Sequence, residues 1–145
     1  MDKLLAILKG ERSPGLYKVI EDVNIEELSS LCQEYGFQFF YINGKNVTSK
    51  AEFLQAAAET MNFPDYFGEN WDAFSECITD LSWLSADGYI LLYTHPDNFA
   101  NNSPSEWSIA LDVFQEAVEY WRETDTPLYL LLKTDNLALD ELDVL

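Results

Sequence analysis

The feature that most constrains the fold is the alternation of short apolar runs with longer segments of helical periodicity. Four runs carry the β-branched and aromatic residues typical of strands, and they span residues 16–20, 37–42, 89–93 and 128–132. The runs at 37–42 and 89–93 are apolar almost throughout, which is typical of strands buried on both faces. This order of elements predicts right-handed βαβ units, and therefore an α/β fold with a mostly parallel β-sheet packed with helices.

Helical patterns fill the intervals between these runs. A short amphipathic segment opens the chain near residues 4–8, and longer helices are expected at 25–34, 50–61, 69–84 and 104–122. Thr48 or Ser49 can cap the helix at 50–61, and Pro104 falls in the first turn of the last helix. With 145 residues, 48% of them hydrophobic, the chain can build one domain with a sizeable core.

The charge of the chain excludes several classes of function. Eight Lys and Arg residues stand against 26 Asp and Glu residues, which gives a net charge of −18. Because such a chain repels phosphate backbones and anionic lipid surfaces, we expect no direct nucleic-acid binding and no membrane binding. A basic protein or a cation is the partner that this charge attracts. No apolar run approaches about 18 residues and no signal-peptide pattern opens the chain, so we expect a cytoplasmic location, with Cys32 and Cys77 as reduced thiols.

The acids concentrate on two of the expected helices. No Lys or Arg occurs between Ala51 and Trp121, where 13 acids lie. On the helix expected at 69–84, four acids fall within about 80° of one another, opposite the apolar residues: Glu69, Asp72, Glu76 and Asp80. A second acidic stripe follows the helix at 104–122 and comprises Asp112, Glu116, Glu119 and Glu123. Each stripe alone is typical of a solvated helix face, and the two together leave a solvated face and a docking surface as open alternatives.

No constellation typical of a catalytic or metal site stands beside these acids. The single histidine, His95, is expected in a turn after a strand. Cys77 lies near Glu76 and Asp80, whose charge raises the pKa of a thiol and disfavours a nucleophile. The sequence has no GxGxxG loop, no nucleophile elbow and no spaced His and Cys ligands. We therefore expect a protein without enzymatic activity, without a cofactor and without a metal.

One stretch of the sequence is specific enough to suggest a family. Residues 63–74 have the sequence FPDYFGENWDAF, and they follow a Tyr-Ile-Asn-Gly run at 41–44 and a Phe-Leu pair at 53–54. The pattern resembles barstar-type intracellular inhibitors of secreted ribonucleases of the barnase kind, over roughly residues 37–133. This resemblance implies a parallel α/β sandwich whose acidic loop and helix block the basic active site of a microbial ribonuclease. It also divides the chain into an N-terminal extension packed on the same domain, which adds a strand and a helix (1–36), a barstar-like domain (37–134) and an acidic C-terminal tail (135–145).

The resemblance further implies which residues bind the partner. Tyr66 matches a tyrosine that lies against the rim of the enzyme's active site, and Asp72 matches an aspartate that pairs with the enzyme's basic groups. Glu76 matches the central aspartate that takes the place of the substrate phosphate, and Glu116 matches a further interface glutamate. The complete expected set is Tyr66, Glu69, Asp72, Ser75, Glu76, Asp80 and Glu116.

The sequence also departs from the family pattern within this set. Glu76 is one methylene longer than the family's aspartate, and Ser75 stands where the family has an interface tryptophan. Asp80 replaces a glycine, and Tyr120 replaces a second glutamate on the long helix. Two functions follow as hypotheses. The first is an acidic inhibitor, a monomer by analogy, that occludes a basic ribonuclease or related toxin. The alternative is an immunity or antitoxin-type protein that neutralises a basic partner other than a ribonuclease.

Overall fold

A computed structural model describes residues 2–64, 68–134 and 142–145 of the chain. Within these residues, five strands form one sheet with the order β2-β3-β4-β1-β5, and every neighbouring pair is parallel. The strands are β1 (Leu16–Val19), β2 (Phe37–Asn43), β3 (Gly88–Thr94), β4 (Leu128–Lys133) and β5 (Asp143–Val144). The prediction of an α/β fold around a mostly parallel sheet is therefore confirmed.

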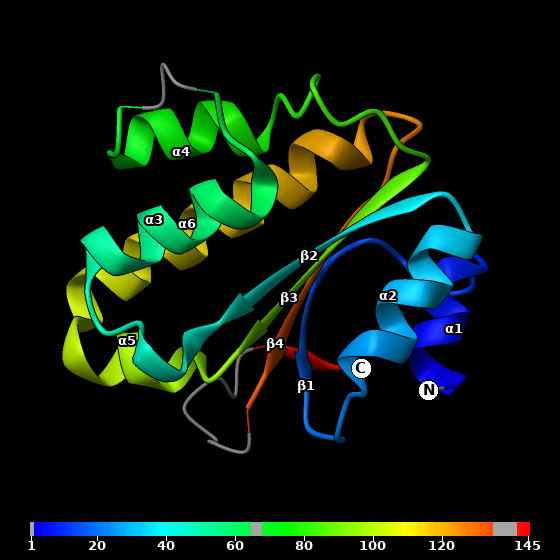
Figure 1. Ribbon diagram of the computed structural model, residues 1–145, viewed down its shortest axis with the longest axis horizontal. Coiled ribbons are helices and arrows are strands. Elements are labelled where there is room, and N and C mark those ends of the chain that lie inside the picture. The colour runs from blue at the N-terminus through cyan, green and yellow to red at the C-terminus, as the bar shows by residue number, and fades with distance from the viewer. Residues whose placement is uncertain (1, 65–67, 135–141) are drawn as a thin grey trace.

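Helices cover both faces of this sheet (Figure 1). On one face lie α1 (Asp2–Leu8) and α2 (Ile25–Glu34). On the other face lie α3 (Lys50–Met61), α4 (Trp71–Ile78), α5 (Pro96–Asn102) and α6 (Pro104–Arg122), and a short 3-10 helix, η1 (Gly44–Asn46), precedes α3. No helix in the described part of the chain is both long enough and apolar enough to span a membrane.

The central strands explain why the sequence runs are apolar on both faces. In β3, Leu91 and Tyr93 point into the core beneath α3 to α6, while Ile90 and Leu92 point into the core beneath α1 and α2. All four side chains are at most 1% exposed. Alternation along a strand directs successive side chains to opposite faces, so a sheet covered on both sides needs apolar residues at every position.

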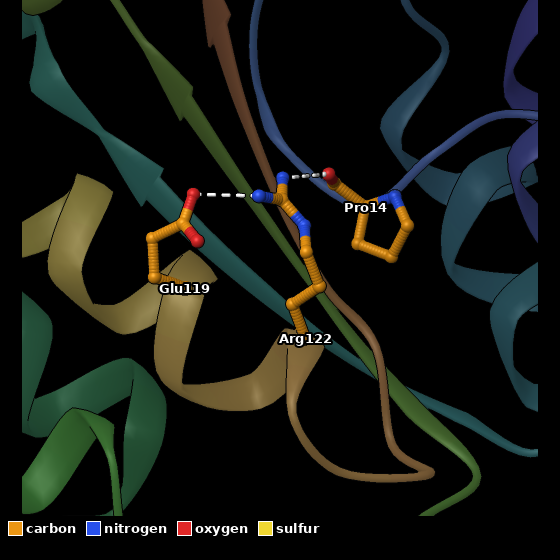
Figure 2. A network of polar contacts seen from close by, with 3 residues as sticks. All are labelled: Pro14, Glu119 and Arg122. Carbon is orange, nitrogen blue, oxygen red and sulfur yellow. Dashed lines mark hydrogen bonds and ion pairs between the residues drawn. The ribbon is translucent and has the colours of Figure 1, made fainter.

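The N-terminal segment takes part in the sheet itself. Strand β1 pairs with β4, with Leu16 opposite Leu130, and its other edge pairs with β5. From β1 the chain passes through α2 to β2 at the far edge of the sheet. Arg122, at the end of α6, also holds the turn before β1, because it donates a hydrogen bond to the carbonyl of Pro14 at 2.9 Å (Figure 2).

The acidic C-terminal tail is described only in part. Its acids Asp135, Asp140 and Glu141 lie outside the described residues. At its end, the N–H of Leu145 donates to the carbonyl of Lys18 at 2.9 Å, and the Leu145 side chain is buried. The last residues therefore dock on the edge of the sheet beside β1.

The turn expected around His95 leads into a helix that the sequence pattern does not predict. His95 is exposed and adopts a left-handed conformation with φ of 54°, and α5 begins directly after it at Pro96. Proline at the first helical position has its φ preset for a helix. At seven residues α5 is too short to show a clear helical period, so the sequence pattern predicts only a turn there.

Candidate docking surface

Helix α4 carries the centre of the expected site, and Asn70 determines where it begins. The side-chain oxygen of Asn70 accepts a hydrogen bond from the N–H of Ala73 at 2.8 Å, which caps the first turn. Glu69, directly before the cap, has a left-handed φ of 53°. The helix therefore starts at Trp71, and the expectation that it starts at Glu69 is wrong.

The same helix ends earlier than its apolar periodicity suggested. The Thr79 hydroxyl donates to the carbonyl of Ser75 at 2.7 Å, and Leu81 adopts a left-handed φ of 48°. A left-handed residue cannot continue a right-handed helix. Leu81 is nevertheless fully buried, so it keeps its place in the core outside the helix. The expected end at Leu84 is wrong, because the apolar side chains after Ile78 remain packed against the core while the backbone is no longer helical.

The two faces of α4 differ as the sequence predicted. Phe74, Cys77 and Ile78 are buried, whereas Asp72 and Glu76 are exposed. Of the other expected site residues near α4, Ser75 is half-buried, Glu69 and Asp80 flank the helix in exposed positions, and Tyr66 lies outside the described residues. Of the four carboxylates expected on this helix, only Asp72 and Glu76 belong to it, and Glu69 and Asp80 lie just before and just after it.

Two indole groups fix α4 against α6. The Nε1–H of Trp71, at the start of α4, donates to Oε2 of Glu106 at 2.6 Å. The Nε1–H of Trp121 donates to the carbonyl of Ile78, at the end of α4, at 2.9 Å. Glu106 does not stand out in the sequence, because no local pattern pairs residues 35 positions apart.

The second acidic stripe lies on the exposed side of α6. The expected interface residue Glu116 is exposed, and so are Asp112 and Glu123. Glu119 differs from them, because its Oε1 lies 2.6 Å from a guanidinium nitrogen of Arg122 (Figure 2). Helices α4 and α6 are neighbours in the fold. We call their exposed carboxylates Asp72, Glu76 and Glu116 together the acidic surface.

Among the described residues, no carboxylate of the acidic surface forms an ion pair. The ion pairs within the described part of the chain join Lys3 to Glu21 and Arg122 to Glu119. Unpaired like charges on adjacent helices create a negative potential at the surface.

The acids near α4 act on the ionisable groups beneath them. Burial is the main cause that raises the pKa of the Cys77 thiol, and the carboxylates of Asp80 and Glu76 raise it further. The pKa of Tyr89 is raised by burial and then by Asp80. A raised pKa keeps the Cys77 thiol protonated at neutral pH. The described residues also contain no group of three or more His, Cys, Asp or Glu side chains that could hold a metal ion.

Comparison with known proteins adds fold and family information. No curated protein matches the chain. Among solved structures, it is similar to Cdc6p from Pyrobaculum aerophilum, with 23% identity and a TM-score of 0.61 over 97% of this chain. It is also similar to the Orc1 protein of Aeropyrum pernix, solved in complex with DNA, with 15% identity and a TM-score of 0.64 over 96% of this chain. The chain spans 40% and 38% of those proteins, and at such identity the likeness concerns the fold alone.

The sequence itself matches a family model. Residues 37–133 match the model described as barstar, the barnase inhibitor. This region runs from the start of β2 to the end of β4, so it includes α4 and α6 with the acidic surface. Because the match covers well over half of the 145 residues, the chain belongs to the barstar family.

Proposed function

We propose that the protein is an inhibitor that binds a basic ribonuclease and occludes its active site with the acidic surface. The observation that carries the proposal is the pair of exposed carboxylates on α4, Asp72 and Glu76, in a member of a family of ribonuclease inhibitors. Neither carboxylate forms an ion pair within the described part of the chain.

The chemistry of a ribonuclease explains why such a surface would bind. An enzyme that cleaves RNA gathers Arg, Lys and His side chains around the substrate phosphate, and carboxylates can occupy the same positions as the phosphate oxygens. Glu76 would enter the phosphate pocket, with Asp72 and Glu116 pairing with basic groups around it. Opposed electrostatic fields would speed association, and salt would slow it.

The residues that depart from the family pattern bear on which enzyme is bound. Ser75 is small and half-buried on α4, and Asp80 is exposed just after the end of this helix. A partner therefore needs little apolar surface opposite Ser75 and an additional donor or cation opposite Asp80. These features favour a ribonuclease with a more basic and less apolar active-site rim than an enzyme that is bound through the family's tryptophan at the position of Ser75.

An RNA-cleavage assay tests the proposal. A barnase-type ribonuclease is titrated with the protein, and cleavage is expected to stop at one inhibitor per enzyme. Binding without loss of cleavage would contradict occlusion of the active site. Failure to bind that ribonuclease, together with binding to a basic toxin that does not cleave RNA, would overturn the proposal in favour of an immunity-type protein.

A further inference from the structure

The first turns of three helices meet at the indole of Trp71. Trp71 is the first residue of α4, and Glu106, which accepts its Nε1–H at 2.6 Å, lies in the first turn of α6. Lys50, the first residue of α3, places its Nζ 6.0 Å from the centre of the Trp71 ring. All three helices begin at the left of Figure 1.

Lys50, Trp71 and Glu106 together form a junction between the three helices. The start of a helix carries a partial positive charge, and Glu106 lies in the first turn of α6 beside the first turn of α4. A hydrogen bond to an ionised acceptor is shorter and stronger than one between neutral groups. The bond is also partly buried, which reduces the competition from water.

The junction fixes the part of α4 that carries the acidic surface. Asp72 directly follows Trp71, and the Trp71 ring packs against Phe53 and Phe74 at centroid distances of 5.7 and 6.0 Å. In one short helix, a shift of the first residue moves the carboxylates of Asp72 and Glu76 relative to Glu116 on α6. A docking surface held in its bound arrangement loses less entropy on association.

We infer that Glu106 is a positioning residue, which acts through Trp71 to set the α4 carboxylates of the acidic surface relative to α6. This inference rests on the proposed function for its effect on binding. The junction itself can be tested without any partner.

The partner-free test measures amide hydrogen exchange along α4. Trp71→Phe removes the indole N–H, Glu106→Ala removes the acceptor, and Glu106→Gln keeps an oxygen that can accept. We expect exchange at Phe74 to Ile78 to become about tenfold faster in Trp71→Phe and in Glu106→Ala, and to stay within about threefold of wild type in Glu106→Gln. The control is Glu26→Ala, which removes an exposed first-turn acid from α2 on the opposite face of the sheet.

The binding test uses the same variants with a barnase-type ribonuclease. Trp71→Phe and Glu106→Ala should each weaken binding about tenfold, the double variant should be no weaker than either, and Glu106→Gln should bind as wild type. Equal losses in Glu106→Gln and Glu106→Ala would show that Glu106 contacts the partner directly and would overturn the inference. Unchanged exchange along α4 would overturn it too, whereas failure of the wild type to bind counts against the proposed function alone.

Discussion

Asp72 and Glu76 are exposed acids four residues apart on α4, and the proposed function has both carboxylates pair with basic groups of a partner. Asp72→Ala and Glu76→Ala should each weaken binding to a ribonuclease by about 2–5 kcal/mol, as expected when one partner of a buried charge pair is removed. The melting temperature should change little, because both side chains point away from the core. Calorimetry of binding and thermal unfolding of each variant check both statements.

Glu26→Ala is the matched control for these two substitutions, because Glu26 is an exposed acid in the first turn of α2. It should leave binding nearly unchanged while lowering the net negative charge by the same amount. If the control weakens binding as much as Asp72→Ala does, the overall charge of the chain drives association, and the assignment of the acidic surface is wrong.

Glu52 stabilises the start of α3 in a way that depends on pH. Its carboxylate accepts hydrogen bonds from the backbone N–H and hydroxyl of Thr48, at 3.0 and 2.9 Å, and from the Ser49 hydroxyl at 3.2 Å. The Thr48 bonds first, and then that of Ser49, lower the pKa of Glu52 below its ordinary value of 4.5. A lowered folded-state pKa means that the stabilisation is complete above 4.5 and is lost as the pH falls through the folded-state pKa.

Comparison of the wild type with Glu52→Gln isolates this effect from the other carboxylates. The wild type should have the higher melting temperature at neutral pH, and the difference should shrink as the pH falls below 4.5. A difference that stays constant down to acidic pH would show that the charge of Glu52 plays no part in capping α3.

Among the elements, α3 to α6 are joined by one aromatic cluster centred on Phe53. Its ring packs against Trp71 and Phe74 of α4, Phe99 of α5 and Phe114 of α6, with centroids 5.4–5.9 Å apart. Phe53 is fully buried, so Phe53→Ala should lower the free energy of unfolding by about 3–5 kcal/mol through the cavity it leaves.

Tyr120→Ala is the aromatic control for this substitution, because Tyr120 is 49% exposed on α6. Its loss should change the free energy of unfolding by about 0.5 kcal/mol or less. Chemical denaturation of both variants makes the comparison, and similar losses from both would contradict the assignment of Phe53 as the centre of the cluster.

Local signals in the sequence predicted the helices well where caps and periodicity agree. Helix α3 starts after Ser49 and ends at Met61 as expected, because a capping residue and an apolar stripe coincide there. Helix α4 was expected to be longer, since Leu81 and Leu84 continue the apolar spacing after the backbone has left the helix. The fold class and the exposed acids could be predicted from the sequence. The order of the strands and the bond between Trp71 and Glu106 depend on long-range packing, which periodicity does not contain.

On the scale of the whole molecule, the N-terminal segment and the family region share one sheet. Strand β1 lies between β4 and β5, and α1 and α2 cover a face that includes Ile90, Leu92, Tyr129 and Leu131, all of them buried. We propose that residues 1–36 and 37–134 form a single folding unit rather than a domain with a separable extension.

Deletion of residues 1–36 tests this proposal. The truncated chain should lose cooperative thermal unfolding and aggregate, because an apolar sheet face would meet water. The full chain with an unrelated folded domain fused before residue 1 is the control, and it should unfold as the wild type does. Cooperative unfolding of residues 37–145 alone would show that the family region is independent.

The net charge of −18, with no Lys or Arg between Ala51 and Trp121, should make the affinity for a basic partner depend on salt. Titration calorimetry with a barnase-type ribonuclease, at low and at high salt, tests most directly whether the acidic surface binds such an enzyme. We predict one-to-one binding that is tight at low salt and weaker at high salt, because ions screen the opposed fields. Absence of binding at low salt, or binding that salt does not affect, would contradict the account.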